Sequence, residues 1–221
     1  QHGTITVISP DKSSAFELTT FRSDGPYSDS RHPDKVDFVQ SIKEDLARRD
    51  FTINAMAWSP KKGLLDPYDG QADLESKKIR AVGNSSKRFK EDALRISRAR
   101  RFASELGLKI EDTTYLAAKQ NKCKVGKISG ERKRIELCKT LMGDFAVPTL
   151  RKYRNLIAPV VPEIVAMFDF DHNSPYHEYD VWEHTLHALE HSSKNLLVRV
   201  VLLFHDCGKP EACFREGDIC H

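Results

Sequence analysis

Two adjacent arginines, an aspartate and an asparagine gather where a charged stretch of the chain turns apolar. Arg48, Arg49 and Asp50 precede an apolar run that starts at Phe51, and Asn54 lies within that run. Guanidinium groups bind phosphate oxygens in a bidentate manner, and carboxylate and amide groups exchange hydrogen bonds with sugar hydroxyls. These residue types suit a site for the triphosphate and ribose of a nucleotide, although an ordinary strand flanked by solvated charges has the same pattern.

A second group of charges lies on a predicted helix over residues 87–106. At the helical period, Arg95 projects into an apolar arc beside Phe102, where a guanidinium is costly unless it is paired. Asp92 stands three residues earlier, within reach of an i,i+3 contact. Side by side, these two groups can accept from the exocyclic amine of cytosine or adenine and donate to the same base edge. The plainer interpretation is a salt bridge within the helix.

A third group concentrates histidines near the end of the chain. The apolar run Val198–Phe204 ends on His205 and Asp206, and His184 lies on the preceding predicted helix. If the two helices pack together, these three side chains meet at one helix end. Imidazole and carboxylate ligands suit a transition metal or Mg²⁺.

Both strands and helices have to position these groups. Residues 3–8 and 15–21, rich in Val, Ile, Thr and Phe, predict a hairpin, and residues 51–58 and 78–82 are candidates for further strands. From about residue 86 the pattern is helical, with capping residues at 84–86 and Gly107 ending the first helix. The predicted helices are 87–106, 111–121, 129–142, 147–156, 162–168, 180–193 and 195–206. This order of elements predicts an α+β chain.

Composition agrees with a soluble globular protein, with 30% charged and 39% hydrophobic residues and a net charge of +3. Basic residues cluster in 87–101, 119–127 and 132–139, which suits either a phosphate backbone or a solvated helix face. No apolar run reaches membrane-spanning length. The cysteines are odd in number and form no CxxC pair, which predicts free thiols in a reducing, cytoplasmic compartment: Cys123, Cys138, Cys207, Cys213 and Cys220.

The segment from Asp45 to Ala57 resembles the DLxRRDFTxNAxA motif of the tRNA nucleotidyltransferase and poly(A) polymerase family, in its bacterial-eukaryotic class. Other segments resemble further motifs of that family in the same order along the chain: His2–Thr4, Glu17–Arg22, Tyr27–Pro33, Leu65–Gly70 with Asp73–Leu74, and Arg88–Arg95. The likeness extends over residues 1–168. Several motifs in one order make it specific.

This resemblance implies template-independent addition of CMP and AMP, from CTP and ATP, to tRNA 3′ ends. It implies part of a polymerase β-like head with a mixed sheet over residues 1–83. An all-α neck and body over residues 84–170 would bind nucleobase and RNA. In the family, the residues matching Asp92 and Arg95 pair with the incoming base, those matching Arg98 and Arg101 continue toward the nucleotide, and the one matching Arg49 contacts phosphate. Ser129–Glu136 resembles a further motif that buttresses the site.

In the family, two metal ions held by clustered carboxylates assist nucleotide transfer. For this chain we expect the ions to be Mg²⁺. Two of those carboxylates come from an early DxD block that no residue pair in this chain fits. Glu17 is the remaining candidate for an acidic residue near the metals, unless it is a solvent-facing residue of its strand. The first residue is Gln in a strand-like run, so we expect a piece of a longer chain that does not incorporate nucleotides by itself.

Residues 176–185, together with His205 and Asp206, resemble the HD domain found fused to bacterial tRNA nucleotidyltransferases. This resemblance implies that residues 171–221 begin a truncated, all-α HD domain. Its metal ligands would be His184, His205 and Asp206, holding Ni²⁺, Mn²⁺ or Mg²⁺. The fourth ligand of the pattern lies farther along, and Asp218 is too near to supply it.

Two other functions remain open on the sequence. A poly(A) polymerase shares nearly all of these motifs, and the base-reading residues do not separate it from a CCA-adding enzyme. An HD-type phosphohydrolase or nucleotide-sensing module with a vestigial transferase part is the other. The sequence does not set the oligomeric state.

Overall fold

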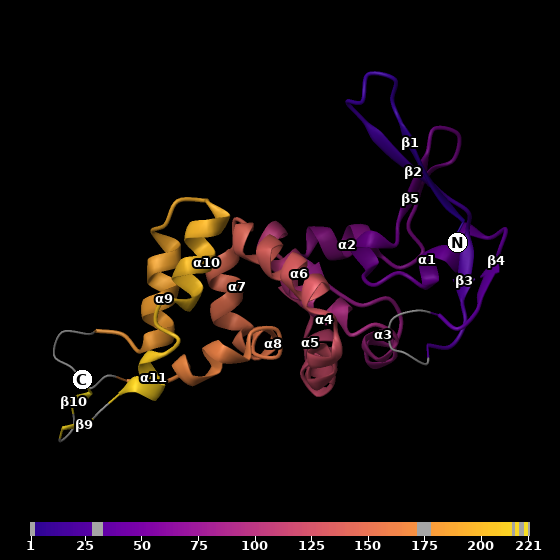
Figure 1. Ribbon diagram of the computed structural model, residues 1–221. Helices are drawn as coiled ribbons and strands as arrows, with labels where there is room; N and C mark the ends of the chain where they lie inside the picture. Colours follow the sequence, from indigo (N-terminus) through magenta and orange to yellow (C-terminus); the bar gives the residue numbers. More distant parts are fainter. Residues whose placement is uncertain (1–2, 28–32, 172–177, 214, 217–218, 221) are drawn as a thin grey trace.

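The computed structural model describes residues 3–27, 33–171, 178–213, 215–216 and 219–220. Short strands dominate the first part of the chain and helices the remainder, so the predicted α+β class is confirmed. The molecule is elongated, with the strand-rich part at one end and the C-terminal helices at the other (Figure 1). No described helix is long and apolar enough to cross a membrane.

The predicted hairpin is present. Strand β1 (Thr4–Ile8) pairs antiparallel with β2 (Ala15–Thr19), and the side chains on both faces are exposed. The other strands of the described residues also pair two by two instead of joining one larger sheet. These pairs are β3 (Arg22–Asp24) with β4 (Val36–Phe38), β5 (Ala57–Ser59) with β6 (Gly63–Leu65), β7 (Lys78–Ile79) with β8 (Lys109–Ile110), and β9 (Arg215–Glu216) with β10 (Ile219–Cys220).

The strand expected over residues 51–58 forms only at its end, as β5. Phe51 makes a single bridge to Ala81, and Thr52–Asn54 is a turn of 3₁₀ helix, η1. Local hydrogen bonds explain the difference, because Asp50 Oδ1 accepts from the Phe51 amide at 2.9 Å and from Asn54 Nδ2 at 3.2 Å. Such side-chain bonds to nearby groups compete with a strand ladder.

Two short helices in this part were not among the predicted elements: α1 (Ile42–Ala47) and α2 (Gly70–Glu75). The Asp66 carboxylate stabilises the start of α2, since it accepts from the amides of Gly70 at 2.7 Å and Gln71 at 2.9 Å. Gly70 packs so closely on η1 that a Cβ there would lie 2.4 Å from the Thr52 carbonyl oxygen. Helices of this length show too few turns for an apolar stripe to reveal them.

The predicted helix 87–106 is interrupted. The chain forms α3 (Ser85–Glu91) and α4 (Leu94–Leu106), and Asp92 between them is extended, with φ −143° and ψ 107°. Its Oδ1 accepts from the amide of Leu94, the first residue of α4, at 3.0 Å, so the Asp92 side chain satisfies a backbone donor at the start of the second helix. The predicted end at Gly107 is confirmed, because Gly107 adopts the left-handed conformation with φ 66°.

The helices predicted after Gly107 are present in the predicted order with slightly different bounds: α5 (Asp112–Asn121), α6 (Gly130–Met142), α7 (Ala146–Lys152), α8 (Arg154–Ile157), the 3₁₀ helix η3 (Pro162–Met167), α9 (Val181–Glu190) and α10 (Leu196–Phe204). The 3₁₀ helix η2 (Lys122–Lys127) and the short helix α11 (Lys209–Ala212) were not among the predicted elements. The predicted helix 147–156 divides at Tyr153, where φ is −113° and ψ 32°.

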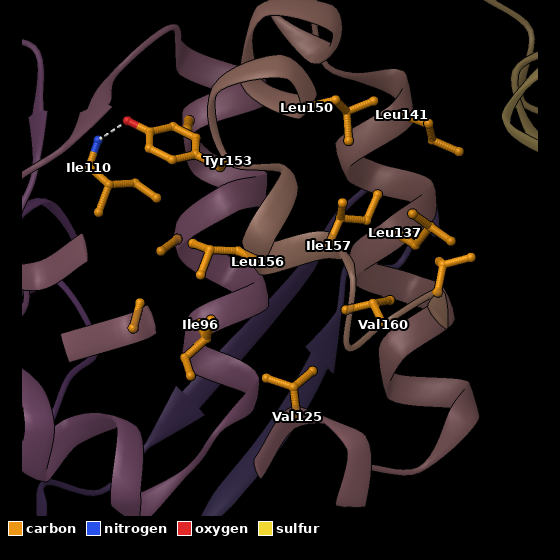
Figure 2. Close-up of a cluster of buried hydrophobic side chains, with 14 of the residues drawn as sticks. Ile96, Ile110, Val125, Leu137, Leu141, Leu150, Tyr153, Leu156, Ile157 and Val160 are labelled. Carbon is orange, nitrogen blue, oxygen red and sulfur yellow. Dashed lines mark hydrogen bonds between the residues drawn. The ribbon is translucent and has the colours of Figure 1, made fainter. Parts of the chain in front are cut away.

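Helix α4 lies at the centre of the core. It packs against α6, α7 and α8 and contacts β8. Figure 2 shows the buried side chains between these helices, among them Ile96, Leu141 and Leu156. Tyr153 Oη accepts from the Ile110 amide at 2.9 Å, which ties β8 to the α7–α8 junction.

The free thiols predicted from the cysteine pattern are confirmed for Cys123, Cys138 and Cys207. The prediction is wrong for Cys213, which is disulfide-bonded. Disulfide formation depends on which sulfur atoms the fold brings together, and neither an odd count nor the lack of a CxxC pair determines that.

Replacing Leu141, a fully buried residue of α6, with Ala should lower the free energy of unfolding by ~2–5 kcal/mol, because the substitution leaves a cavity. The matched control is Leu116→Ala on α5, where the side chain is 56% exposed; there the change should stay within about 0.5 kcal/mol. Urea unfolding followed by circular dichroism measures both. Equal losses in the two variants would contradict the packing described for α4 and α6.

Candidate functional site

A pocket of about 470 Å³ opens where the end of α1, the turn η1 and the start of α4 meet. We call it the arginine pocket. Its lining contains every residue predicted to bind nucleotide except Arg101: Arg48, Arg49, Asp50, Asn54, Asp92, Leu94, Arg95, Arg98, Phe102 and Arg132. The lining holds more guanidinium than carboxylate groups, which favours a multiply charged anion as ligand.

Asp50 and Arg98 join η1 to α4 across the pocket. Arg98 Nε donates to Asp50 Oδ2 at 2.6 Å, and Asp50 is only 8% exposed. The terminal nitrogens of Arg98 make no hydrogen bond within the described part of the chain. Arg98 also lies 5.3 Å from the centre of the Phe102 ring. A ligand in the pocket therefore meets a guanidinium whose position is already set.

Arg95 is buried and links three segments. Its Nη1 donates to Glu91 Oε2 at 2.8 Å and to the Arg88 carbonyl oxygen at 3.3 Å, and its Nη2 donates to the Arg48 carbonyl oxygen at 3.1 Å. Asp92 has a different partner, since its Oδ2 accepts from Arg132 Nη2 at 2.9 Å. The salt bridge considered between Asp92 and Arg95 is therefore not formed, because the chain leaves the helix at Asp92. Both side chains still line one pocket.

Asp45 positions the two adjacent arginines. Its buried carboxylate accepts from Arg48 Nη2 at 2.6 Å and from Arg49 Nη2 at 2.9 Å, and it also accepts from the Arg22 amide at 3.2 Å. Burial by itself raises the pKa of this carboxyl, but the hydrogen bonds from Arg48 and Arg49 outweigh it, so the pKa is lowered from its usual value.

Arg101 lies behind the pocket and not in its lining. It is 7% exposed, its Nε is 3.5 Å from Glu136 Oε2, and its guanidinium sits 4.3 Å from the centre of the Phe102 ring. Asp45 and Arg132 are the residues that the sequence interpretation did not assign. The i,i+3 and i,i+4 spacing of Asp45 to Arg48 and Arg49 was the available signal for the first. Arg132 belonged to a basic cluster and to the segment Ser129–Glu136, which was expected only to buttress the site.

Glu17 lies on β2 opposite Thr6 and is exposed. The β1–β2 hairpin that carries it extends away from α4 (Figure 1), and Glu17 is not in the lining of the arginine pocket. Within the described ranges, no group of three potential metal ligands includes Glu17.

The predicted metal ligands do come together. His184 on α9 and the pair His205 and Asp206 after α10 place one ligand atom each within 4.8 Å of the others, the one such group in the described part. The Asp206 Oδ2 atom is 3.3 Å from His205 Nε2, 3.8 Å from His184 Nε2 and 2.9 Å from Lys209 Nζ. Two imidazoles around a buried carboxylate fit a transition-metal ion. Asp218 and the motif residues His2, Ser28–His32 and Tyr176–His177 lie outside the described residues.

Two family models match the chain in separate regions. Residues 1–80 match the family described as poly A polymerase head domain. Residues 107–167 match the family described as probable RNA and SrmB-binding site of polymerase A. The arginine pocket draws its lining mainly from the first region and from the segment between the two.

Several curated relatives are named CCA-adding enzyme. That of Ligilactobacillus salivarius (strain UCC118) is 42% identical over 190 residues, which are 82% of this chain and 46% of the relative. That of Pediococcus pentosaceus is 51% identical over 143 residues, 65% of this chain and 36% of the relative. The chain thus spans half or less of the length of these relatives.

Solved structures agree with the relatives. The crystal structure of Bacillus stearothermophilus CCA-adding enzyme in complex with CTP has a TM-score of 0.62 and 30% identity, over 93% of this chain and 62% of that one. A tRNA nucleotidyltransferase complexed with a primer tRNA and an incoming ATP analog has a TM-score of 0.61 and 26% identity, over 93% of this chain and 61% of that one.

The depressed pKa of Asp45 makes stability depend on pH. As the pH falls, the Asp45 carboxylate is protonated first in the unfolded chain, near the ordinary aspartate pKa of ~3.9. The stabilisation is therefore complete above that value and is lost as the pH falls through the lower folded pKa. Asp45→Asn should reduce the free energy of unfolding at neutral pH, and its deficit against the wild type should shrink as the pH falls below the ordinary carboxyl pKa.

Urea unfolding at several pH values measures that difference. The control is Asp37→Asn, which removes a carboxylate paired with exposed Lys35 on β4 and should change stability little. A deficit of Asp45→Asn that stays constant down to acid pH would contradict the proposed role of the Asp45 charge.

Proposed function

Because the chain belongs to the class II family of CCA-adding enzymes and poly(A) polymerases, we propose that it supplies the nucleotide-selecting part of a template-independent tRNA nucleotidyltransferase. The complete protein would add CMP and AMP, from CTP and ATP, to the 3′ ends of cytoplasmic tRNA. The arginine pocket is the observation that supports this proposal. It brings together motif residues from two separate segments, 48–54 and 92–98, around one cavity of about 470 Å³. The domain ranges 1–83, 84–170 and 171–221 are part of the same proposal.

Each part of a nucleoside triphosphate finds matching groups in the pocket. Arg49, whose side chain is 43% exposed, and the terminal nitrogens of Arg98 are donors for the triphosphate. Asn54 and Asp50 stand beside each other for ribose hydroxyls. Arg48 is a positioning residue, because Asp45 and the Arg22 carbonyl oxygen already occupy its side chain. Arg101 acts through Phe102, behind the pocket.

Asp92 and Arg95 would read the base. Their internal partners, Arg132 and Glu91, hold them in place without a ligand. Asp92 then accepts from an exocyclic amine, and Arg95 donates to the neighbouring ring atom. Cytosine and adenine both offer that pattern, whereas uracil and guanine lack the amine at that position. Asp92 gives up or shares its contact with Arg132 on binding.

The catalytic Mg²⁺ ions of this reaction are not assigned to the described residues. Exposed Glu17 belongs to no group of three potential metal ligands among those residues. Glu17 remains the proposed acidic residue of the metal site in the complete protein.

We also propose that His184, His205 and Asp206 bind Ni²⁺, Mn²⁺ or Mg²⁺, as in an HD domain. When bound, such an ion would activate water for hydrolysis of a phosphoester. Asp206 supplies the anionic ligand, and Lys209 at 2.9 Å balances its charge before an ion enters.

A poly(A) polymerase is the second candidate, favoured by the descriptions of the two families that match residues 1–80 and 107–167. The relatives named CCA-adding enzyme favour the first. Supplying labelled CTP and ATP separately to the complete protein with tRNA lacking its end discriminates them. If the complete protein used ATP alone and added long tails, it would be a poly(A) polymerase. If it incorporated neither CMP nor AMP but hydrolysed phosphoesters, an HD-type enzyme would be favoured.

Asp92→Ala should bring the affinities for CTP and ATP closer to those for UTP and GTP. Each edge contact is worth ~1–3 kcal/mol of discrimination, so the preference should fall by a factor between about 5 and about 150. Arg49→Ala should weaken all four nucleotides alike, because it contacts phosphate. Calorimetric titration of the chain measures these affinities, with Asp37→Ala as the control carboxylate variant. Unchanged selectivity in Asp92→Ala would show that this residue does not read the base.

His205→Ala should abolish binding of Ni²⁺ or Mn²⁺ to the chain, because it removes a direct ligand. The control is His191→Ala, since His191 lies at the end of the same helix as His184 but outside the ligand group. Equilibrium dialysis with metal analysis measures occupancy. CTP binding should be the same in both variants. Retained metal in His205→Ala would contradict the assigned ligand set.

A further inference from the structure

Two aromatic rings lie against each other at the start of α9. Tyr179 precedes the cap residue Asp180, and the centre of its ring is 4.2 Å from that of His187, with 30° between the ring planes. Tyr179 is 43% exposed and His187 is half-buried. We call this pair the α9 platform. Aromatic rings that remain accessible to solvent can stack on a further aromatic ring.

The α9 platform lies beside the metal-ligand group. His184 and His187 are three positions apart, which places their Cβ atoms about 5–6 Å apart on one helix surface. The centre of the His184 ring is 5.5 Å from that of His205. The rings therefore form a row from the ligand group to Tyr179. A ribose bridges a gap of this order between a phosphate and a base, so one nucleotide can reach both ends of the row.

The core of the fold does not use the two rings of the platform. Helix α9 packs through other side chains, among them Trp182 and Leu186. Within the described residues, Tyr179 and His187 belong neither to the buried core nor to the partly buried side chains that pack against it. The chain beside Tyr179 is nevertheless fixed, because the Asp180 carboxylate caps α9 by accepting from the Glu183 amide at 2.7 Å. The platform is thus held in place while its rings remain available to a ligand.

We propose that the α9 platform binds the base of a nucleotide whose phosphate meets the ion held by His184, His205 and Asp206. This inference rests on the proposed metal site and adds the chemical class of its ligand, a phosphoester that carries an aromatic base. Phosphate oxygens fill open positions on a divalent ion. Stacking uses the π face that every base has, so the platform favours nucleotides over phosphosugars without selecting one base.

Calorimetric titration of the Ni²⁺-loaded chain with adenosine 5′-monophosphate and with ribose 5-phosphate tests the platform. Tyr179→Ala should lower the affinity for adenosine 5′-monophosphate about fivefold or more, because the base loses a ring on which it stacks. Tyr179→Phe keeps the ring and should bind this nucleotide as the wild type does. Ribose 5-phosphate should bind equally to all three proteins. The arginine pocket is unchanged in the variants, so its own binding of nucleotide is common to the series.

The matched control is Trp58→Ala. Trp58 is a 69% exposed aromatic residue of β5, at the opposite end of the molecule from α9 (Figure 1). This variant should bind adenosine 5′-monophosphate like the wild type. Equal losses in Tyr179→Ala and Trp58→Ala overturn the inference. Unchanged nucleotide affinity in Tyr179→Ala, with only a lower melting temperature, also overturns it and leaves the pair as packing at the start of the helix.

Two further readouts separate this inference from the proposed metal site. Equilibrium dialysis should show equal Ni²⁺ binding by Tyr179→Ala and the wild type, because Tyr179 is not in the ligand group. If Ni²⁺ binds but Tyr179→Ala leaves nucleotide affinity unchanged, the inference is overturned and the metal site stands. A wild type that takes up no Ni²⁺ overturns both. Photolysis with 8-azidoadenosine 5′-monophosphate should label residues 178–191, and labelling confined to the arginine pocket overturns the inference.

Discussion

The buried guanidinium of Arg95 is the interaction on which the arrangement of the site depends. A charge taken out of water is tolerated only if its donors are satisfied. Here the partners are the Glu91 carboxylate and the carbonyl oxygens of Arg88 and Arg48. They belong to α3 and to the end of α1, while Arg95 itself belongs to α4. Satisfying one side chain therefore fixes where three helices stand relative to one another, and with them the arginine pocket.

Ion pairs between neighbouring segments give the site its preorganisation. Asp45 holds Arg48 and Arg49, Asp50 holds Arg98, and Asp92 holds Arg132. Because each guanidinium is already oriented, little side-chain entropy is lost when an anion binds. The same pairing limits which groups remain free for a ligand. The ion pairs leave some groups, such as the terminal nitrogens of Arg98, free for a ligand. Other side chains, such as that of Arg48, are occupied by their partners within the protein.

The metal-ligand group at the other end of the molecule is held by different contacts. His184 comes from α9, whereas His205 and Asp206 follow α10, so the group depends on how those two helices pack. Trp182 and Leu186 on α9 are buried in the core that α4 and α7 share. The two sites thus share a framework of packed helices but no side chain.

The sequence by itself determined the α+β class, the hairpin, the order of most helices and most of the charged residues around the arginine pocket, but not Arg132. Those features follow from local periodicity, capping residues and motif chemistry. Only the tertiary structure decided that Asp92 breaks the helix, that Thr52–Asn54 turns instead of extending, and that Asp92 pairs with Arg132, forty positions away. It also decided that Arg101 lies behind Phe102 and that Cys213 is oxidised. The physical reason is that each charged group takes whichever partner the folded chain brings nearest. Separation along the sequence does not measure that distance.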